Sequence, residues 1–217
     1  MLYTLGLIGI CIAWLLPGHY YPWTGFQQDS FAAVGALLAG LGAVVTVRQW
    51  PVRVPAMAII ALLLATVPIA QWAFGFLHYR LDAALPAAYV IAFALAIVAA
   101  RQLATSPSRF PLALFGAIWV AAIVSIGIGL VQWLQIGPYD FIETTAAWER
   151  VSGNIRQPNQ LASLFGLAIA ASLWAFETRR VGRIGTVLAI ATFGFGIVMT
   201  QSRTGWLFVV LIVLFWA

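Results

Sequence analysis

The sequence has one cysteine, no lysine and few charged residues of either sign. Cys11 stands alone in 217 residues, and all eleven basic residues are arginine, against six acidic ones. A lone cysteine excludes an intramolecular disulfide and a metal site built from cysteines. Charged residues make up 8% of the chain, whereas ordinary soluble domains carry roughly 25%. This scarcity excludes an ordinary soluble domain.

Long apolar runs take the place of charge. Hydrophobic residues make up 63% of the chain, and the mean hydropathy is +0.99. A helix that crosses a bilayer needs ~20 apolar residues, because each residue adds ~1.5 Å across a ~30 Å hydrocarbon core. The runs are too long and uniform for barrel strands, so they predict an all-α fold: a polytopic transmembrane helix bundle with about seven full spans and a truncated eighth. The predicted spans are residues 2–17, 30–47, 54–76, 83–100, 110–134, 160–176 and 184–200, and the eighth starts at Trp206.

The eighth apolar run is too short to cross a bilayer alone. It extends from Trp206 to Ala217, about twelve residues, and has no polar flank at its end. We therefore expect the chain to be a fragment of a longer protein.

The arginines between the spans predict the orientation. One set of connections holds seven of them and the opposite set holds four, and arginine accumulates in cytoplasmic loops. The sequence therefore predicts a cytoplasmic N-terminus, and the isoelectric point near 10.0 reflects topology rather than nucleic-acid binding. The seven are Arg48, Arg53, Arg101, Arg109, Arg179, Arg180 and Arg183, and the four are Arg80, Arg150, Arg156 and Arg203.

A polar cluster interrupts the apolar pattern at the stretch VSGNIRQPNQLASLFGL, residues 151–167. Pro158 suits the first turn of a helix, where its missing N–H removes no bond. A helix start presents free backbone N–H groups and the positive end of its dipole, which favour an anion. Arg156, Gln157, Asn159 and Gln160 add side-chain donors, so the stretch predicts a site for a negatively charged group. The alternative is that Gln157 and Asn159 only cap the helix.

A second cation lies in TQSRTGWL, residues 200–207, where Arg203 stands between two apolar spans. An arginine in that place is costly unless it is paired, hydrated or snorkelling. Guanidinium groups bind diphosphates well because they are planar, permanently charged and bidentate. Arg156 and Arg203 on one face could hold a diphosphate together, although a snorkelling anchor remains the alternative for each.

The remaining polar residues favour structural roles. Arg150 is expected to pair with Glu149 or Glu143 on the outer surface. His19 and His78 are expected to be interfacial or packing residues, because neither has a carboxylate partner or metal-ligand spacing in the sequence. No metal site is predicted.

Two segments resemble a known family. GNIRQPNQLASLFGL, residues 153–167, resembles the signature that precedes the ligase domain of bacterial O-linked protein oligosaccharyltransferases, the PglL type of protein glycosylation ligase. TQSRTGWLFVVLIVL, residues 200–214, is similar to the start of the O-antigen ligase domain. The resemblance implies three regions: transmembrane helices at 1–149, the ligase motif region at 150–183, and the start of the O-antigen ligase domain at 184–217.

The resemblance implies an activity and a place for it. Such enzymes take a complete glycan from an undecaprenyl diphosphate carrier at the periplasmic face of the bacterial inner membrane. They transfer it to a Ser or Thr hydroxyl of an exported protein such as a pilin, without a metal or cofactor. The carry-over makes Arg203 the catalytic arginine, and it places Gln157, Pro158 and Asn159 on the family's Gln-Pro-Asn motif, whereas Arg156 occupies a position that the motif does not fix.

The resemblance also leaves alternatives. An O-antigen ligase or polymerase of the same superfamily, acting on a lipid A core, would look similar in these spans. Two alternatives come from other classes of protein. One is a polytopic transporter of an anionic lipid-linked substrate, and the other is a scaffold with snorkelling arginines. The family's acceptor-activating histidine is expected downstream of Ala217, and neither His19 nor His78 matches it.

Overall fold

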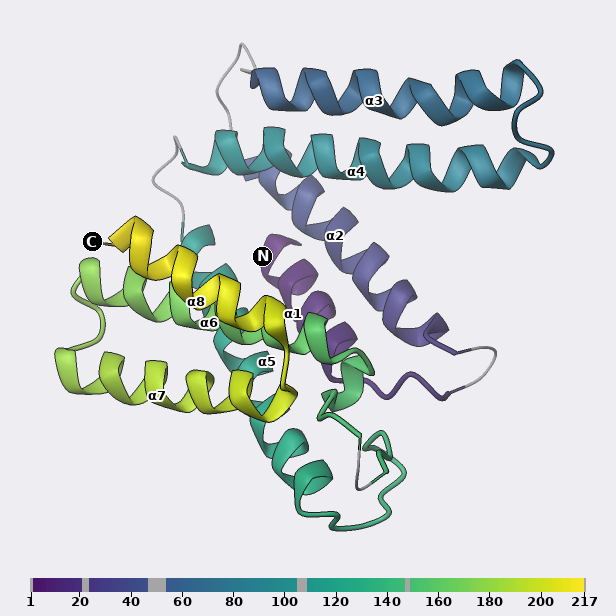
Figure 1. Cartoon of the computed structure of the whole chain (residues 1–217). Helices are drawn as coiled ribbons and strands as arrows, with labels where there is room; N and C mark the ends of the chain where they lie inside the picture. Colours follow the sequence, from purple (N-terminus) through teal and green to yellow (C-terminus); the bar gives the residue numbers. More distant parts are fainter. Residues whose placement is uncertain (1, 21–23, 47–53, 105–108, 147–148, 217) are drawn as a thin grey trace. The chain divides into compact units, whose positions relative to one another are not determined.

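The computed structural model describes residues 2–20, 24–46, 54–104, 109–146 and 149–216, and all regular structure in these ranges is helical (Figure 1). The predicted topology residues Arg48 and Arg53 lie outside the described ranges. The helices are α1 (Leu2–Leu15), α2 (Phe26–Thr46), α3 (Ala56–Ala73), α4 (Arg80–Ala104), α5 (Phe110–Trp133), the 3-10 turn η1 (Gly153–Ile155), α6 (Pro158–Glu177), α7 (Arg183–Thr200) and α8 (Arg203–Trp216).

The all-α prediction is confirmed, and each predicted span corresponds to a helix. By length and composition, α3, α4, α5, α6 and α7 can each cross a membrane, whereas α1 and α8 are shorter apolar helices. The sequence predicted a first span over residues 2–17, whereas α1 has 14 residues and ends at Leu15, before Pro17. A proline restricts the residue before it to extended backbone, which accounts for the earlier end.

The chain divides into two compact units. Unit 1 comprises Met1–Gly6 and Leu37–Pro111, and unit 2 comprises Leu7–Ala36 and Leu112–Ala217. In unit 1, α3 and α4 lie side by side as an antiparallel pair (Figure 1). Their contact is built on the buried side chains of Ala58, Ala61 and Ala94. Small residues let two helices approach closely, as is usual inside a membrane.

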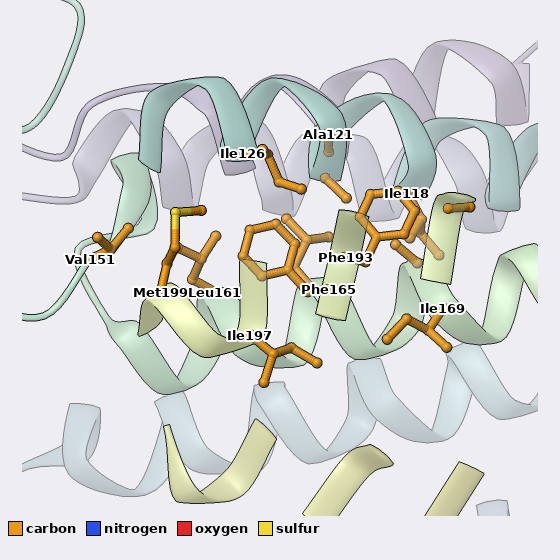
Figure 2. Close-up of a cluster of buried hydrophobic side chains, with 14 residues drawn as sticks. Ile118, Ala121, Ile126, Val151, Leu161, Phe165, Ile169, Phe193, Ile197 and Met199 are labelled. Carbon is orange, nitrogen blue, oxygen red and sulfur yellow. The ribbon is translucent and has the colours of Figure 1, made fainter. Parts of the chain in front are cut away.

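The core of unit 2 is formed by α5, α6 and α7. Phe165 of α6 and Phe193 of α7 are 0% and 1% exposed and stack with ring centroids 6.5 Å apart (Figure 2). Trp119 of α5 meets the edge of Phe193 and donates its indole N–H to Ser172 Oγ at 2.8 Å. The three central helices are therefore held by aromatic packing together with a partly buried hydrogen bond.

Gly196 allows α7 to approach Phe165. A Cβ at Gly196 would lie 2.8 Å from Cε2 of the Phe165 ring, whereas a Cβ at Gly194 would meet no atom within 4 Å. Because the ring is fully buried and cannot move aside, we expect Gly196→Ala to lower the free energy of unfolding by about 1–3 kcal/mol. Gly194→Ala is the matched control and should leave it unchanged or raise it, since alanine favours helix. Thermal unfolding in detergent compares the two, and equal midpoints would contradict the packing argument.

Several helix ends of unit 2 meet at one end of the unit. The loop between α5 and α6 bonds to the end of α1 through Asn154 and Leu15, and the start of α6 bonds to the start of α8 through Asn159 and Ser202. The alternating spans of the predicted topology require these ends to share a membrane face. We call residues 15–20, 28, 132–160 and 200–205 of this end the polar end, leaving aside residues 147 and 148, which are not described.

Candidate functional site

Asn154 organises the loop between α5 and α6. Its side chain is 1% exposed. It donates to the carbonyl oxygens of Leu15 at 2.6 Å and Phe141 at 2.9 Å, and it accepts the N–H of Glu143 at 3.0 Å. The Asn154 carbonyl oxygen in turn accepts from Gln28 Nε2 at 2.7 Å. One carboxamide therefore joins the end of α1 to Phe141 and Glu143 in the loop between α5 and α6.

Gln132 holds the same loop from the end of α5. Its carboxamide, 4% exposed, donates to the carbonyl oxygens of Glu143 and Gly153 at 2.8 and 3.2 Å. Its oxygen accepts the N–H groups of Gly153 and Ser152 at 2.9 and 3.3 Å. A polar side chain on an apolar helix is thus fully satisfied, as burial requires.

Glu143 is the buried acidic group of the polar end. Its side chain is 9% exposed, and Oε1 accepts the backbone N–H of His19 at 2.9 Å and lies 3.1 Å from His19 Nδ1. Arg156 Nε lies 3.6 Å from Oε2 of the same carboxylate. A buried carboxylate is stable only when such partners surround it. The expectation that His19 has no carboxylate partner was wrong, because the partner is 124 residues away in the chain.

Arg156 is fixed from two sides. Its backbone has a φ of 63°, a left-handed conformation that few non-glycine residues adopt. Its side chain passes close to Gly18, where an added Cβ would lie 2.6 Å from the Arg156 Cδ. The guanidinium, whose side chain is 43% exposed, is therefore held beside Glu143 and its charge is compensated there.

The start of α6 is capped and is not as open as the sequence suggested. Gln157 Oε1 accepts the backbone N–H of Asn159 at 2.6 Å, and Pro158 has no N–H. The backbone N–H of Leu161 bonds to the Gln157 carbonyl oxygen at 3.0 Å. Gln157 thus has the capping role that the sequence left as an alternative. Gln160 follows in the first turn as an exposed side chain.

Asn159 connects α6 to the corner between α7 and α8. Its Oδ1 accepts from Ser202 Oγ at 2.9 Å and from Arg150 Nη2 at 3.0 Å. Ser202, 0% exposed, also accepts the N–H of Gly205 at 3.3 Å and so caps the start of α8. Because two donors hold its oxygen, the Asn159 carboxamide has a fixed orientation.

Arg203 is the first residue of α8, directly after the Ser202 cap. It follows a sharp corner in which Gln201 has a left-handed φ of 49° and Thr200 Oγ1 accepts the N–H of Ser202 at 3.3 Å. The side chain of Arg203 is exposed. The corner therefore places Arg203 directly after Ser202, which bonds to Asn159, at the same end of unit 2 as Arg156.

Arg150 has a different partner from the one predicted. Its Nε donates to the carbonyl oxygen of Thr200 at 2.9 Å, and its Nη2 donates to Asn159. Glu149, an expected partner, instead accepts the N–H of Ala146 at 3.1 Å, and Glu143 pairs with His19 and Arg156. The expected acidic pair for Arg150 was wrong, since two carbonyl oxygens across the fold take its place.

A small open cavity lies on another part of the polar end. Its volume is about 140 Å³, and it includes Gln132 and Glu143 but none of the predicted site residues. It is lined by Val131, Gln132, Gln135, Ile136, Gly137, Pro138, Tyr139, Ile142, Glu143, Thr144 and Thr145. Within the described ranges, no three His, Cys, Asp or Glu side chains gather as metal ligands would.

A family model described as a protein glycosylation ligase matches residues 151–176. The predicted resemblance to the protein glycosylation ligases is confirmed. Over its whole length the chain is 28% identical to a general O-oligosaccharyltransferase of Acinetobacter baylyi, across 222 aligned residues. It spans 38% of the length of that relative. No solved structure matches the chain.

The glycosylation ligase match covers part of the polar end together with most of α6. It begins at Val151, includes Asn154, Arg156 and Asn159, and ends in the last turns of α6. Sequence reasoning chose Arg156 to Gln160 from this segment and missed the buried Asn154. The available signal was an asparagine directly after a glycine and shortly before a helix, a place where a carboxamide often bonds to backbone groups.

Proposed function

We propose that the chain belongs to a glycosyltransferase that moves a preassembled oligosaccharide from an undecaprenyl diphosphate carrier to Ser or Thr hydroxyls of exported proteins, pilins among them. The observation that carries the proposal is a coincidence of two features. The segment that matches the protein glycosylation ligases starts α6, and Asn159 in that segment is bonded to the Ser202 corner that carries Arg203. The relative named as a general O-oligosaccharyltransferase supports the same reaction class.

The exposed cation at this corner suits a diphosphate leaving group. When the glycosidic bond to the carrier breaks, negative charge grows on the diphosphate oxygens. A guanidinium fixed at the start of a helix stabilises this charge by bidentate hydrogen bonds. In the proposal Arg203 makes this contact and is the catalytic arginine, and the Nδ2 group of Asn159 and the exposed Gln160 side chain add donors.

Arg156 and Gln157 have secondary places in the proposed donor site. The Arg156 guanidinium is paired with Glu143, so it contributes a partly compensated charge at the edge. Gln157 caps α6 and positions Asn159 for the diphosphate. The reaction is proposed to need no metal or cofactor.

The proposed site lies at the periplasmic face of the bacterial inner membrane, with the N-terminus in the cytoplasm. The bias of arginine toward one set of connections supports this orientation. The proposed organisation keeps transmembrane helices at 1–149, the ligase motif region at 150–183 and the beginning of an O-antigen ligase domain at 184–217.

The experiment is a transfer assay with the protein as its gene encodes it. The protein, reconstituted in lipid, is supplied with an undecaprenyl diphosphate-linked glycan and with two acceptors, an exported protein rich in Ser and Thr and a lipid A core. The proposal expects a glycosylated protein band that appears only with the diphosphate-linked donor. Transfer to the lipid A core alone would instead identify an O-antigen ligase, and binding without transfer to either acceptor would favour a transporter.

A further inference from the structure

The cations of the polar end differ in how their charge is compensated. Arg156 pairs with the buried Glu143 carboxylate. In the described part of the chain, neither Arg150 nor Arg203 makes an ion pair. Both of these arginines are exposed. The uncompensated positive charge therefore lies at the corner of α6, α7 and α8 and not beside Glu143.

Two hydrogen bonds hold one edge of the Arg150 guanidinium and leave its other edge available. Nε bonds to the Thr200 carbonyl oxygen at 2.9 Å and Nη2 bonds to Asn159 Oδ1 at 3.0 Å, so both contacts use the Nε–Nη2 edge. The guanidinium is a rigid planar fork whose second edge, Nη1–Nη2, carries further N–H donors. Oxyanions of a phosphate accept two parallel hydrogen bonds from such an edge. The protein thus fixes the plane of the group and leaves its second edge for another acceptor.

The Asn159 side-chain oxygen brings Arg150 close to the start of α8. Asn159 Oδ1 accepts from Arg150 Nη2 and from Ser202 Oγ, so these two donor atoms are at most about 6 Å apart. Arg203 follows Ser202 directly in the chain. Arg150 and the first residue of α8, Arg203, therefore lie at the same carboxamide, one through its guanidinium and the other through the neighbouring Ser202.

We propose that Arg150 is a further donor-binding residue, and that its free edge holds one phosphate of the lipid diphosphate while Arg203 holds the other. This inference rests on the proposed function, because it assigns a second residue to the same donor site. Arg156, compensated by Glu143, then serves the architecture of the loop more than the binding of the diphosphate. A single cation would suffice for a monophosphate, whereas two cations select a diphosphate.

The test measures how strongly the protein, in lipid nanodiscs, prefers undecaprenyl diphosphate to undecaprenyl monophosphate. Arg150→Gln keeps a neutral donor toward the corner but removes the charge and the fork, so we expect about a tenfold or larger loss of diphosphate affinity. Monophosphate affinity should change much less. Arg150→Lys keeps the charge without the fork and should fall between the wild type and Arg150→Gln.

Two control variants separate binding from architecture. Ser202→Ala removes the other hydrogen bond to Asn159 Oδ1 and the cap of α8 without changing the charge, and Arg183→Ala removes an exposed arginine at the start of α7. If Arg150 only fixed the corner, Arg150→Gln would lower diphosphate and monophosphate affinity alike, as Ser202→Ala would, and an unchanged diphosphate preference would overturn the inference. Thermal unfolding midpoints, measured for all variants, identify any loss caused by unfolding.

The failure of each proposal has its own signature. A wild-type protein that binds the diphosphate no more tightly than the monophosphate would overturn the proposed donor site as a whole. If the wild type prefers the diphosphate and Arg203→Ala loses that preference while Arg150→Gln and Arg150→Lys retain it, only the role of Arg150 is overturned.

Discussion

Arg203→Ala is expected to abolish glycan transfer while the protein still inserts into the membrane. Its side chain is exposed and makes no ion pair in the described part of the chain, so removing it should change stability by about 0.5 kcal/mol or less. In the proposed donor site, the charge that develops on the diphosphate would lose its guanidinium partner. Removing one preorganised donor of this kind slows reactions by about 10²–10³-fold, and a full guanidinium should do at least as much.

The measurement is the rate of transfer from the undecaprenyl diphosphate-linked glycan, with the amount of inserted protein determined in parallel. Arg183→Ala is the matched control, because Arg183 also begins a helix, α7, and is exposed. It should transfer at the wild-type rate. Arg203→Lys should keep the charge and recover only part of the rate, since an ammonium group lacks the bidentate geometry. Wild-type transfer by Arg203→Ala would remove this residue from the donor site.

The helices could be predicted from the sequence because the length and uniformity of the apolar runs determine them. The apolar runs are long enough to cross a membrane and too uniform for strands, and backbone groups in lipid must bond within their own segment. The start of α6 at Pro158 also follows from local chemistry, since proline suits the first helical turn. Such features depend on neighbours in the chain, so one sequence contains the information.

The partners of the polar side chains could not be predicted in the same way. Arg150 has Glu149 beside it in the chain, yet it bonds to the Thr200 carbonyl oxygen 50 residues away. His19 finds Glu143 across 124 residues. These choices depend on which helix ends meet, and that is decided by the packing of Phe165 and Phe193 and by glycines such as Gly196, not by sequence distance. Arg203 and Asn159 could be proposed as site residues from the sequence because they interrupt apolar runs, whereas the bonds of Asn159 to Arg150 and Ser202 could not be predicted.

The segment that matches the glycosylation ligases has a buried part and an exposed part. Gly153 and Asn154 are buried and bonded to α1 and α5, whereas Asn159 and Gln160 are exposed at the start of α6. The first pair holds the loop before α6 to α1 and α5, and in the proposed function the second pair contacts the donor. Variants in the two parts of the segment should therefore fail in different ways.

Asn154→Ala is expected to have the largest effect on folding in the polar end. The change would leave the carbonyl oxygens of Leu15 and Phe141 and the N–H of Glu143 without their partner. Each buried polar group left unsatisfied costs about 1–3 kcal/mol, so the free energy of unfolding should fall by about 3 kcal/mol or more. The loop would also release Glu143 and with it Arg156, because both are positioned through this residue.

Thermal unfolding in detergent measures the loss, and limited proteolysis between residues 134 and 157 reports on the loop itself. Gln157→Ala is the matched control from the same motif, since its carboxamide caps α6 at an exposed position and should cost only about 1 kcal/mol. Asn154→Asp should be nearly as damaging as Asn154→Ala, because an aspartate can accept from Glu143 but cannot donate to the two carbonyl oxygens. If Asn154→Ala unfolds at the same temperature as Gln157→Ala, the loop is held by its apolar contacts, and the buried carboxamide is not what connects the polar end to α1.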